Sequence, residues 1–218
     1  MRLACQAVLF DMDGTLADST VVVEELWSRF AVETGHPSED VIDFAHGRPS
    51  VATIREFAPE GDVASWTARF HDWELELFDH VPAVPGAVAL TQSIPRERWA
   101  VVTSAVRSAA LRRLEAIGVG EPPLLIGADE VAHGKPDPEG YARAAAQLGF
   151  SSAQCIVFED VEAGLRAGHA SGATGVVIGQ HRSAFADTLP RVADLTGVTA
   201  TVTEDGLVLD GIGEPLAH

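Results

Sequence analysis

The chain has 218 residues, 46% of them hydrophobic, and a formal net charge of −17 at pH 7. This length and apolar content are enough for a sizeable buried core and argue against a disordered chain. The negative charge repels nucleic acids and anionic membranes, so we expect neither as a partner. No apolar run approaches the roughly 20 residues that span a bilayer, and we therefore predict a cytoplasmic protein.

A first strand is predicted from Leu3 to Phe10, and a long stretch with a helical pattern follows it. Between about Ala17 and Val84 we find no convincing strand. Within this stretch, Asp62 to Asp79 and Val21 to Phe30 each place apolar side chains on one helix face. In the former segment these side chains are Trp66, Phe70, Trp73 and Leu77, which we interpret as packing core.

The helical stretch predicts an inserted domain. We expect a small helical domain at residues 17–83 and a core domain made of residues 1–16 and 84–218. Val81 to Gly86 contains two prolines and a glycine, which stop helices and stiffen the chain. We interpret this segment as the linker that returns to the core.

Beyond this linker, apolar runs rich in β-branched residues alternate with helical patterns. The predicted strands are Trp99 to Thr103, Leu124 to Ile126, Cys155 to Phe158 and Thr174 to Ile178. The predicted helices are Ser108 to Ile117, Glu139 to Leu148 and Val161 to Ala170. Strands that are apolar throughout indicate a sheet buried on both faces. The pattern predicts an α/β fold with a Rossmann-like, doubly wound parallel sheet and right-handed crossovers.

Two features outside this alternation carry no chemistry that we can identify. Residues Val198 to Leu209 alternate apolar and polar side chains around a glycine and predict a short hairpin. Cys5 and Cys155 lie in apolar runs, where cysteine packs as a small hydrophobic residue, so the sequence does not indicate a disulfide.

Polar side chains follow several of the predicted strands. The first strand leads into Asp11 and Asp13, and paired acids at the end of a buried strand are costly unless they share a cation or a proton. An Asx-type turn that caps the next helix is the alternative interpretation. The later strand ends carry further polar residues: Thr103 and Ser104, then Lys135, then Glu159 and Asp160. Parallel strands bring these ends to one edge of the sheet, where ligands bind in such folds.

This set of side chains suits phosphoryl chemistry. Mg²⁺ prefers hard oxygen ligands, and Asp11 and Asp160 could provide them. A transferring phosphoryl group needs positive charge and hydrogen-bond donors, which Lys135, Thr103 and the backbone N–H groups after Asp11 could supply. Lys135 is the only lysine of the chain, whereas arginine supplies the other basic side chains. We therefore favour a functional role for it over that of a surface residue.

Four segments together resemble the ordered motifs of the haloacid dehalogenase superfamily. They are Asp11-Met12-Asp13-Gly14-Thr15, Val101-Val102-Thr103-Ser104, Gly134-Lys135-Pro136-Asp137-Pro138 and Phe158-Glu159-Asp160-Val161-Glu162-Ala163-Gly164. A single Asp-x-Asp is a weak signal, but all four motifs in this order at strand ends are specific. The inserted helical segment resembles the small cap of the subgroup that includes β-phosphoglucomutase and many sugar and polyol phosphatases.

The resemblance implies a phosphatase mechanism for a small phosphorylated metabolite. Asp11 would attack phosphorus and become an aspartyl phosphate, and Asp13 would act as general acid and then as general base. Thr103 and Lys135 would hold the phosphoryl oxygens. Magnesium would be bound by the Asp11 carboxylate, the Asp13 backbone carbonyl and Asp160, with Glu159 acting through water. The expected substrate-binding residues are Ser104, Gly14 and, from the cap, Arg48, for which a solvent-facing position is the alternative.

Several other functions compete with this one. A phosphosugar mutase uses the same aspartate, but the mutases of the superfamily have a histidine where this chain has Val23 and a lysine in the cap, where this chain has none. A phosphonatase also needs a cap lysine, and dehalogenases lack the second acid, here Asp13. A receiver-like phosphoacceptor is shorter and lacks the inserted domain. A non-catalytic scaffold would not be expected to keep all the acids. The small cap is compatible with a monomer.

Overall fold

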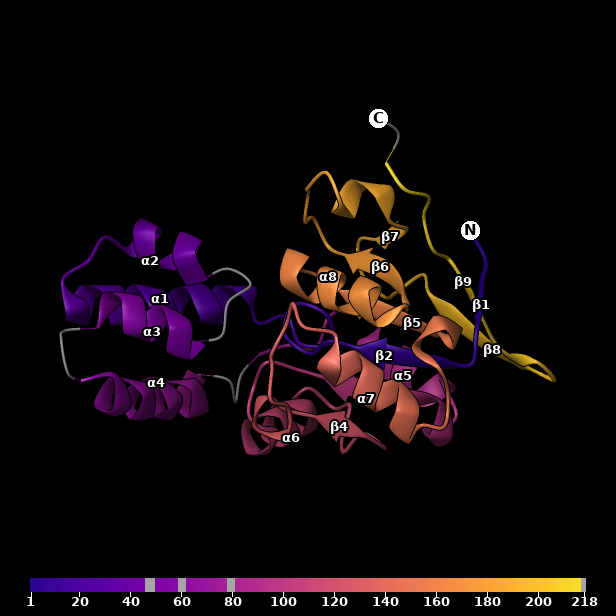
Figure 1. The fold of residues 1–218 in the computed structure, drawn as a ribbon, viewed down its shortest axis with the longest axis horizontal. Helices are drawn as coiled ribbons and strands as arrows, with labels where there is room; N and C mark the ends of the chain where they lie inside the picture. Colours follow the sequence, from indigo (N-terminus) through magenta and orange to yellow (C-terminus); the bar gives the residue numbers. More distant parts are fainter. Residues whose placement is uncertain (46–49, 59–61, 78–80, 217–218) are drawn as a thin grey trace.

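The structure is a computed structural model that describes residues 1–45, 50–58, 62–77 and 81–216. In this part of the chain, six parallel strands form one sheet in the order β4-β3-β2-β5-β6-β7 (Figure 1). The strands are β2 (Ala7–Phe10), β3 (Trp99–Val102), β4 (Leu125–Ile126), β5 (Cys155–Glu159), β6 (Thr174–Ile178) and β7 (Arg191–Val192). The order reverses at β2, because the chain runs from β2 to β3 and β4 on one side and then crosses to β5 on the other. The predicted α/β fold with a parallel sheet is confirmed.

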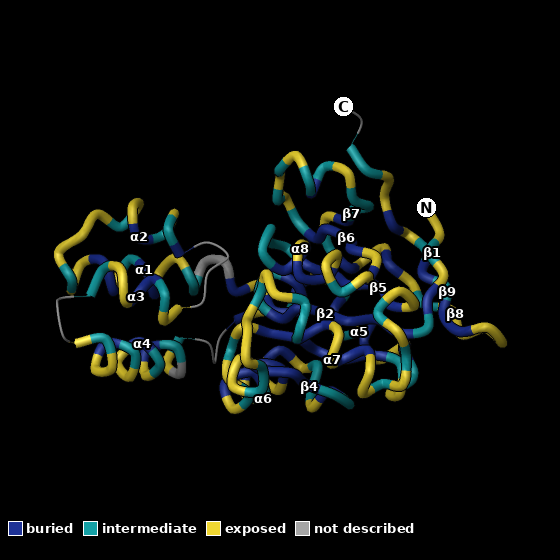
Figure 2. Tube along the Cα trace, viewed as in Figure 1, coloured by how far each residue is buried: buried dark blue, intermediate teal, exposed yellow. Residues whose placement is uncertain are grey.

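Helices cover both faces of this sheet because its central strands are apolar on both sides. In β2, Ala7 and Leu9 belong to a buried cluster with α7 and α8, whereas Val8 and Phe10 belong to a second cluster with α5 and α6. These helices are α5 (Ala87–Ser93), α6 (Arg107–Ala116), α7 (Glu139–Gln147) and α8 (Glu162–Ser171). Figure 2 shows the strands as buried and the outer helix faces as exposed. Short 3-10 turns complete the connections: η2 (Arg96–Arg98), η3 (Ala128–Glu130), η4 (Ser152–Gln154) and η5 (Ala186–Thr188).

Four helices lie together beside the sheet, on the left of Figure 1. They are α1 (Thr20–Thr34), α2 (Ser38–Ala45), α3 (Ser50–Phe57) and α4 (Val63–Leu77). Aromatic packing between α1 and α4 forms their core: the rings of Trp27 and Phe70 lie 4.2 Å apart, and those of Phe30 and Trp66 lie 5.3 Å apart. The aromatic stripe predicted for α4 is therefore buried packing, with Trp73 also 5% exposed.

The two connections between these helices and the sheet run side by side. Ala17 and Ala83 form an antiparallel bridge, Asp18 N–H donates to Pro82 O, and Val84 N–H donates to Leu16 O. Hydrogen bonds therefore join the outgoing and returning segments at one place. The division into a core of residues 1–16 and 84–218 and a cap of residues 17–83 remains our proposal for the domain organisation.

The predicted single strand from Leu3 to Phe10 is wrong. The chain bends at Gln6, which separates β1 (Leu3–Cys5) from β2. The backbone N–H of Gln6 donates to Gln154 O at 2.7 Å, and its side-chain amide donates to Asp205 O at 2.5 Å. Both partners are distant in the chain, so the local sequence around Gln6 does not reveal such a bend.

A second sheet follows from this bend. β1 pairs antiparallel with β9 (Gly206–Asp210), which pairs with β8 (Thr199–Thr203), so the order is β1-β9-β8. The predicted C-terminal hairpin is confirmed, but its pairing with the N-terminal segment was not predicted. β7 was also missed, because a two-residue strand has no detectable period.

Two smaller expectations also meet the structure. Cys5 and Cys155 are buried and free, as expected. Among the described residues, no helix is both long and apolar enough to cross a bilayer. The cytoplasmic location stays a prediction.

The buried aromatic contacts of β2 predict a large effect of Phe10→Ala. Phe10 has no exposed surface, stacks on Phe158 at 5.5 Å and meets Trp99 edge-on at 6.2 Å. Its truncation should lower the free energy of unfolding by about 3–5 kcal/mol, as measured by urea denaturation. The control Val202→Thr, at a side chain that is 56% exposed, should change it by less than about 0.5 kcal/mol. A loss of under about 1 kcal/mol for Phe10→Ala would contradict this account of the core.

Candidate active site and metal centre

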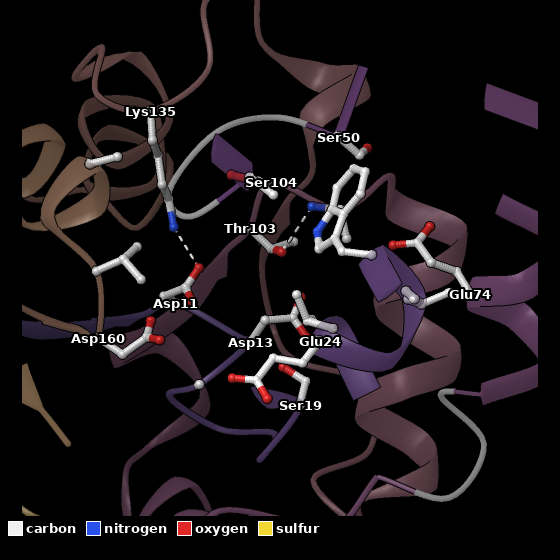
Figure 3. Close-up of a pocket in the computed structure, with 18 of the residues that line it drawn as sticks. Asp11, Asp13, Ser19, Glu24, Ser50, Glu74, Thr103, Ser104, Lys135 and Asp160 are labelled. Atoms are coloured by element: carbon white, nitrogen blue, oxygen red, sulfur yellow. Dashed lines mark hydrogen bonds and ion pairs between the residues drawn. The ribbon is translucent and has the colours of Figure 1, made fainter. Parts of the chain in front are cut away.

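The carboxyl ends of three adjacent strands bring the predicted side chains to one cavity. β2 pairs with β3 on one side and with β5 on the other, so the residues that follow these strands meet. The cavity has a volume of about 230 Å³ and lies between the sheet edge and the cap helices. Figure 3 shows Asp11 beside Lys135 and Asp160 on one side of the cavity and Glu74 of α4 on the other side. Its lining includes the predicted residues Asp11, Asp13, Gly14, Thr103, Ser104, Lys135 and Asp160.

The Lys135 ammonium lies among buried oxygen atoms. Its Nζ is 2.5 Å from Asp11 Oδ1, 2.6 Å from Glu159 Oε1 and 3.0 Å from the carbonyl oxygen of Val102. Burial lowers the pKa of this lysine, but the two adjacent carboxylates outweigh that effect and raise the pKa above its usual value. The side chain therefore stays cationic at the edge of the sheet. The single lysine of the sequence thus places a positive charge at the edge of the cavity.

Glu159 accepts a hydrogen bond from Lys135 on the side away from the cavity. Its carboxylate is fully buried and also accepts hydrogen bonds from Tyr141 Oη at 2.8 Å and from the backbone N–H of Asp160 at 3.1 Å. A Cβ atom at Gly164 would lie 1.6 Å from Glu159 Oε1, so α8 can pass this carboxylate only with glycine there. With its oxygens engaged by protein donors, Glu159 is better placed to orient Lys135 than to bind an ion directly.

Asp11 and Asp160 are two of the acids that line the cavity, and both have raised pKa values. Burial and the neighbouring Glu159 raise the pKa of Asp11 to about 8, although Lys135 acts against them. Burial, followed by Glu159 and Asp11, raises the pKa of Asp160 well above its usual value. Three carboxyl groups thus lie close together beside one ammonium, and burial together with this excess of negative charge disfavours the ionised forms of Asp11 and Asp160.

A divalent cation would relieve this excess. Ligand atoms of Asp11, Glu159 and Asp160 lie within 4.8 Å of one another. Asp160 Oδ1 is buried, and no hydrogen-bond donor among the described residues reaches it. Asp160 can approach because Gly14, at φ 78°, has no side chain; a Cβ atom there would lie 1.9 Å from Asp160 Oδ2. Mg²⁺ prefers oxygen ligands, and all three side chains offer carboxylate oxygens. Since Asp160 Oδ1 accepts no hydrogen bond from the described residues, it is free to bind the ion, and these residues therefore fit Mg²⁺.

The remaining predicted residues are placed as follows. Thr103 is buried, and its Oγ1 accepts a hydrogen bond from Ala105 N–H at 3.1 Å. Ser104 is exposed at the rim of the cavity. The N–H of Gly14 donates to Ala17 O at 2.7 Å, so Gly14 contributes close approach rather than a free donor. Arg48 lies outside the described residues.

Asp13 has a partner that the sequence analysis missed. Its Oδ2 lies 2.5 Å from Nη1 of Arg113 on α6, while Nη2 of Arg113 lies 3.7 Å from Oε1 of Glu74 on α4. Burial is the largest cause of a raised pKa at Glu74; Arg113 lowers this pKa, and Asp13 raises it. One arginine therefore connects the Asp-x-Asp loop with a cap helix.

The sequence carried a signal for some of these residues. In α6, Ala109, Ala110 and Leu114 form the buried face, and Arg113 falls on the same face by helical spacing. A cation on an apolar face indicates a buried partner. Tyr141 is the only tyrosine of the chain, but its pairing with Glu159 depends on how α7 packs on the sheet.

Comparison with known proteins gives a family model and close relatives. A model of haloacid dehalogenase-like hydrolases matches residues 5–172. The chain is 34% identical to hexitol phosphatase A of Escherichia coli over 198 residues, covering 88% of this chain and 89% of that protein. It is 31% identical to 2-deoxyglucose-6-phosphate phosphatase 1 of Saccharomyces cerevisiae over 236 residues, covering 96% of each.

A solved structure shares the fold. The crystal structure of β-phosphoglucomutase from Clostridium difficile matches with a TM-score of 0.75 and 18% identity, covering 88% of this chain and 92% of that one. At this identity the likeness concerns the fold alone.

The raised pKa of Asp11 predicts how Mg²⁺ stabilises the protein at different pH values. The folded state holds the Asp11 proton up to about pH 8, whereas the ordinary value is 3.8. The stabilisation that the folded state gains by holding the Asp11 proton is therefore fully present below pH 3.8 and is lost as the pH rises towards 8. Mg²⁺ binds only the deprotonated acid, so its stabilisation should grow over the same range.

Thermal unfolding with EDTA or with MgCl₂ measures this effect. We expect a larger Mg²⁺-dependent rise in Tm at about pH 8 than at about pH 5, and a much smaller rise for Asp160→Asn. Asp18→Asn, an exposed acid that does not line the cavity, is the matched control and should keep the wild-type rise. Equal rises at both pH values would contradict the arrangement.

Proposed function

This chain belongs to the haloacid dehalogenase-like hydrolases, and we propose that it is a phosphatase that hydrolyses a small sugar or polyol phosphate through a phosphorylated Asp11. The observation that carries the proposal is the position of Asp11. Its carboxylate borders the cavity, contacts the Lys135 ammonium at 2.5 Å and lies close to Asp160. A nucleophile, a fixed cation and a further acid thus converge on the volume that a phosphate group would occupy.

In the first step, a carboxylate oxygen of Asp11 attacks phosphorus as the bond to the leaving alcohol breaks. Asp13, which lines the same cavity, donates a proton to that oxygen, so the alcohol leaves neutral. Lys135 balances the charge on the phosphoryl oxygens, and the Thr103 hydroxyl is available as a donor to them. Ser104 lies at the rim, where it would contact bound substrate.

In the second step, water attacks the phosphorylated Asp11. Asp13, now a carboxylate, accepts a proton from this water as the new P–O bond forms, and Asp11 leaves as the free carboxylate. The products are the alcohol and inorganic phosphate. Glu159 accepts hydrogen bonds from both Lys135 and Tyr141, and we expect these bonds to hold Lys135 in place through both steps.

Mg²⁺ would be held by the carboxylates of Asp11 and Asp160 and the backbone carbonyl of Asp13, with Glu159 acting through water, and would supply positive charge for the phosphate oxygens. Arg48, by its position in the cap segment, remains our candidate for a substrate contact. Both assignments are part of the proposal.

The names of the relatives and the character of the cavity support a sugar or polyol leaving group. Hexitol phosphatase A and 2-deoxyglucose-6-phosphate phosphatase 1 are phosphatases of hydroxyl-rich compounds by name. On the cap side, the polar residues that line the cavity are Glu24, Ser50 and Glu74, which can accept hydrogen bonds from hydroxyl groups. The apolar residues beside them are Val23, Trp27, Ile42 and Phe70. This lining suits the hydroxyl groups and the C–H faces of a polyol.

Hydrolysis is favoured over phosphoryl return to a sugar. Val23 lines the cavity and has no group that can exchange a proton. A mutase would convert a sugar phosphate to its isomer without lasting release of phosphate. Measuring inorganic phosphate and sugar phosphate isomers in the same reaction separates the two functions.

The proposed nucleophile predicts the effect of Asp11→Asn. With a panel of hexitol, deoxyhexose and glycerol phosphates and MgCl₂, the wild type should release phosphate, and Asp11→Asn should lose about 10³-fold or more in kcat. Asp18→Asn, an exposed acid on the same loop that does not line the cavity, should retain wild-type turnover. Hydrolysis by Asp11→Asn near the wild-type rate would reject the mechanism, and absence of phosphate release by the wild type would reject the function.

A further inference from the structure

Arg113 is a buried cation that contacts Asp13, the acid proposed to transfer protons in the reaction. Its side chain is 2% exposed, and Nη1 lies 2.5 Å from Asp13 Oδ2. The other terminal nitrogen, Nη2, lies 3.7 Å from Oε1 of Glu74. Burying a guanidinium is costly unless carboxylates pair with it, and here one comes from the Asp-x-Asp loop and one from the cap.

The geometry of the guanidinium couples these two carboxylates. It is a rigid, planar group that is always charged, so the two nitrogens cannot move independently. A shift of α4 that moves Glu74 would therefore also move the guanidinium and change its contact with Asp13. Arg113 lies closer to Asp13 than to Glu74, so we expect it to orient Asp13 more strongly than Glu74.

The two oxygens of Asp13 differ in their surroundings. Oδ2 is held by Arg113, whereas no donor among the described residues reaches the buried Oδ1. One oxygen is thus anchored, and the other has no donor of its own. An anchored carboxylate keeps one orientation, so its second oxygen can be held towards the attacking water.

We propose that Arg113 is a positioning residue that holds Asp13 as the base for the water that hydrolyses phosphorylated Asp11, and that Glu74 links this hold to the cap. The inference rests on the proposed function. It assigns Arg113 to the second step: as water forms its bond to phosphorus and Asp11 leaves, the water proton passes to Asp13. In the first step, an aryl phosphate needs no such help, because its phenolate leaves without a proton.

Kinetics with p-nitrophenyl phosphate separate the two steps. kcat/KM reports formation of the phosphorylated enzyme, and kcat also reports its hydrolysis. In Arg113→Met, we expect kcat to fall by about 10- to 100-fold while kcat/KM changes by less than about 3-fold, since general base catalysis contributes about 10²- to 10⁴-fold in full. A burst of p-nitrophenol should appear, and intact mass spectrometry should detect one added phosphoryl group.

Matched variants separate positioning from folding. Arg113→Lys keeps the charge but not the planar group, so it should recover part of kcat and show a smaller burst. Glu74→Gln leaves the contact between Arg113 and Asp13 in place but weakens the link between Arg113 and α4, so its burst should be smaller than that of Arg113→Met. Arg96→Met, at an exposed arginine of η2, should match the wild type. Circular dichroism and Tm confirm folding; if Arg113→Met does not fold, Arg113→Lys alone decides the question through its burst.

The outcomes are distinct. Accumulation of phosphorylated enzyme in the Arg113 variants supports the inference. A parallel fall of kcat and kcat/KM without accumulation overturns it, because that pattern indicates a structural or substrate-binding role. A wild-type enzyme that releases no phosphate from any substrate rejects the proposed function instead, and the Arg113 result does not bear on that failure.

Discussion

The contact between the Lys135 ammonium and the Asp11 carboxylate is the interaction on which the site depends. Both groups are buried, and Glu159 lies on the other side of the lysine at 2.6 Å. Each charge alone would be costly to bury, so the fold can keep them only as a group. Because three carboxylates share this single ammonium, the group is still short of positive charge. Burial and the neighbouring Glu159 raise the pKa of Asp11 to about 8, and for this reason we propose that a divalent cation binds here.

The fold supplies this arrangement through its sheet. β2, β3 and β5 are neighbours, so Asp11, Thr103 and Asp160 meet although they are far apart in the chain. The cap helices close the cavity from the other side and pack around their own aromatic core. In the proposed function, the residues at the strand ends carry out the chemistry and the cap residues contact the leaving group. Arg113 contacts both Asp13 of the Asp-x-Asp loop and Glu74 of α4.

Strand-end residues could be predicted because their position follows from local sequence. An apolar run that ends in Asp11, Thr103 or Asp160 indicates the edge of a parallel sheet, and the structure brings these residues together. The bend at Gln6 could not be predicted, because its hydrogen-bond partners lie in distant segments. Arg113 and Glu74 were missed for the same reason: each is one charge on a helix, and only tertiary packing pairs them.

Proton release on Mg²⁺ binding tests this account most directly. Calorimetric titration of the metal-free protein at about pH 7, in buffers of different ionisation enthalpy, gives the number of protons released per bound ion. The account predicts at least about one proton, since Asp11 must lose its proton to bind the ion. Asp11→Asn should abolish that release. Tight Mg²⁺ binding without proton release would show that the acids are already ionised and would contradict the central claim.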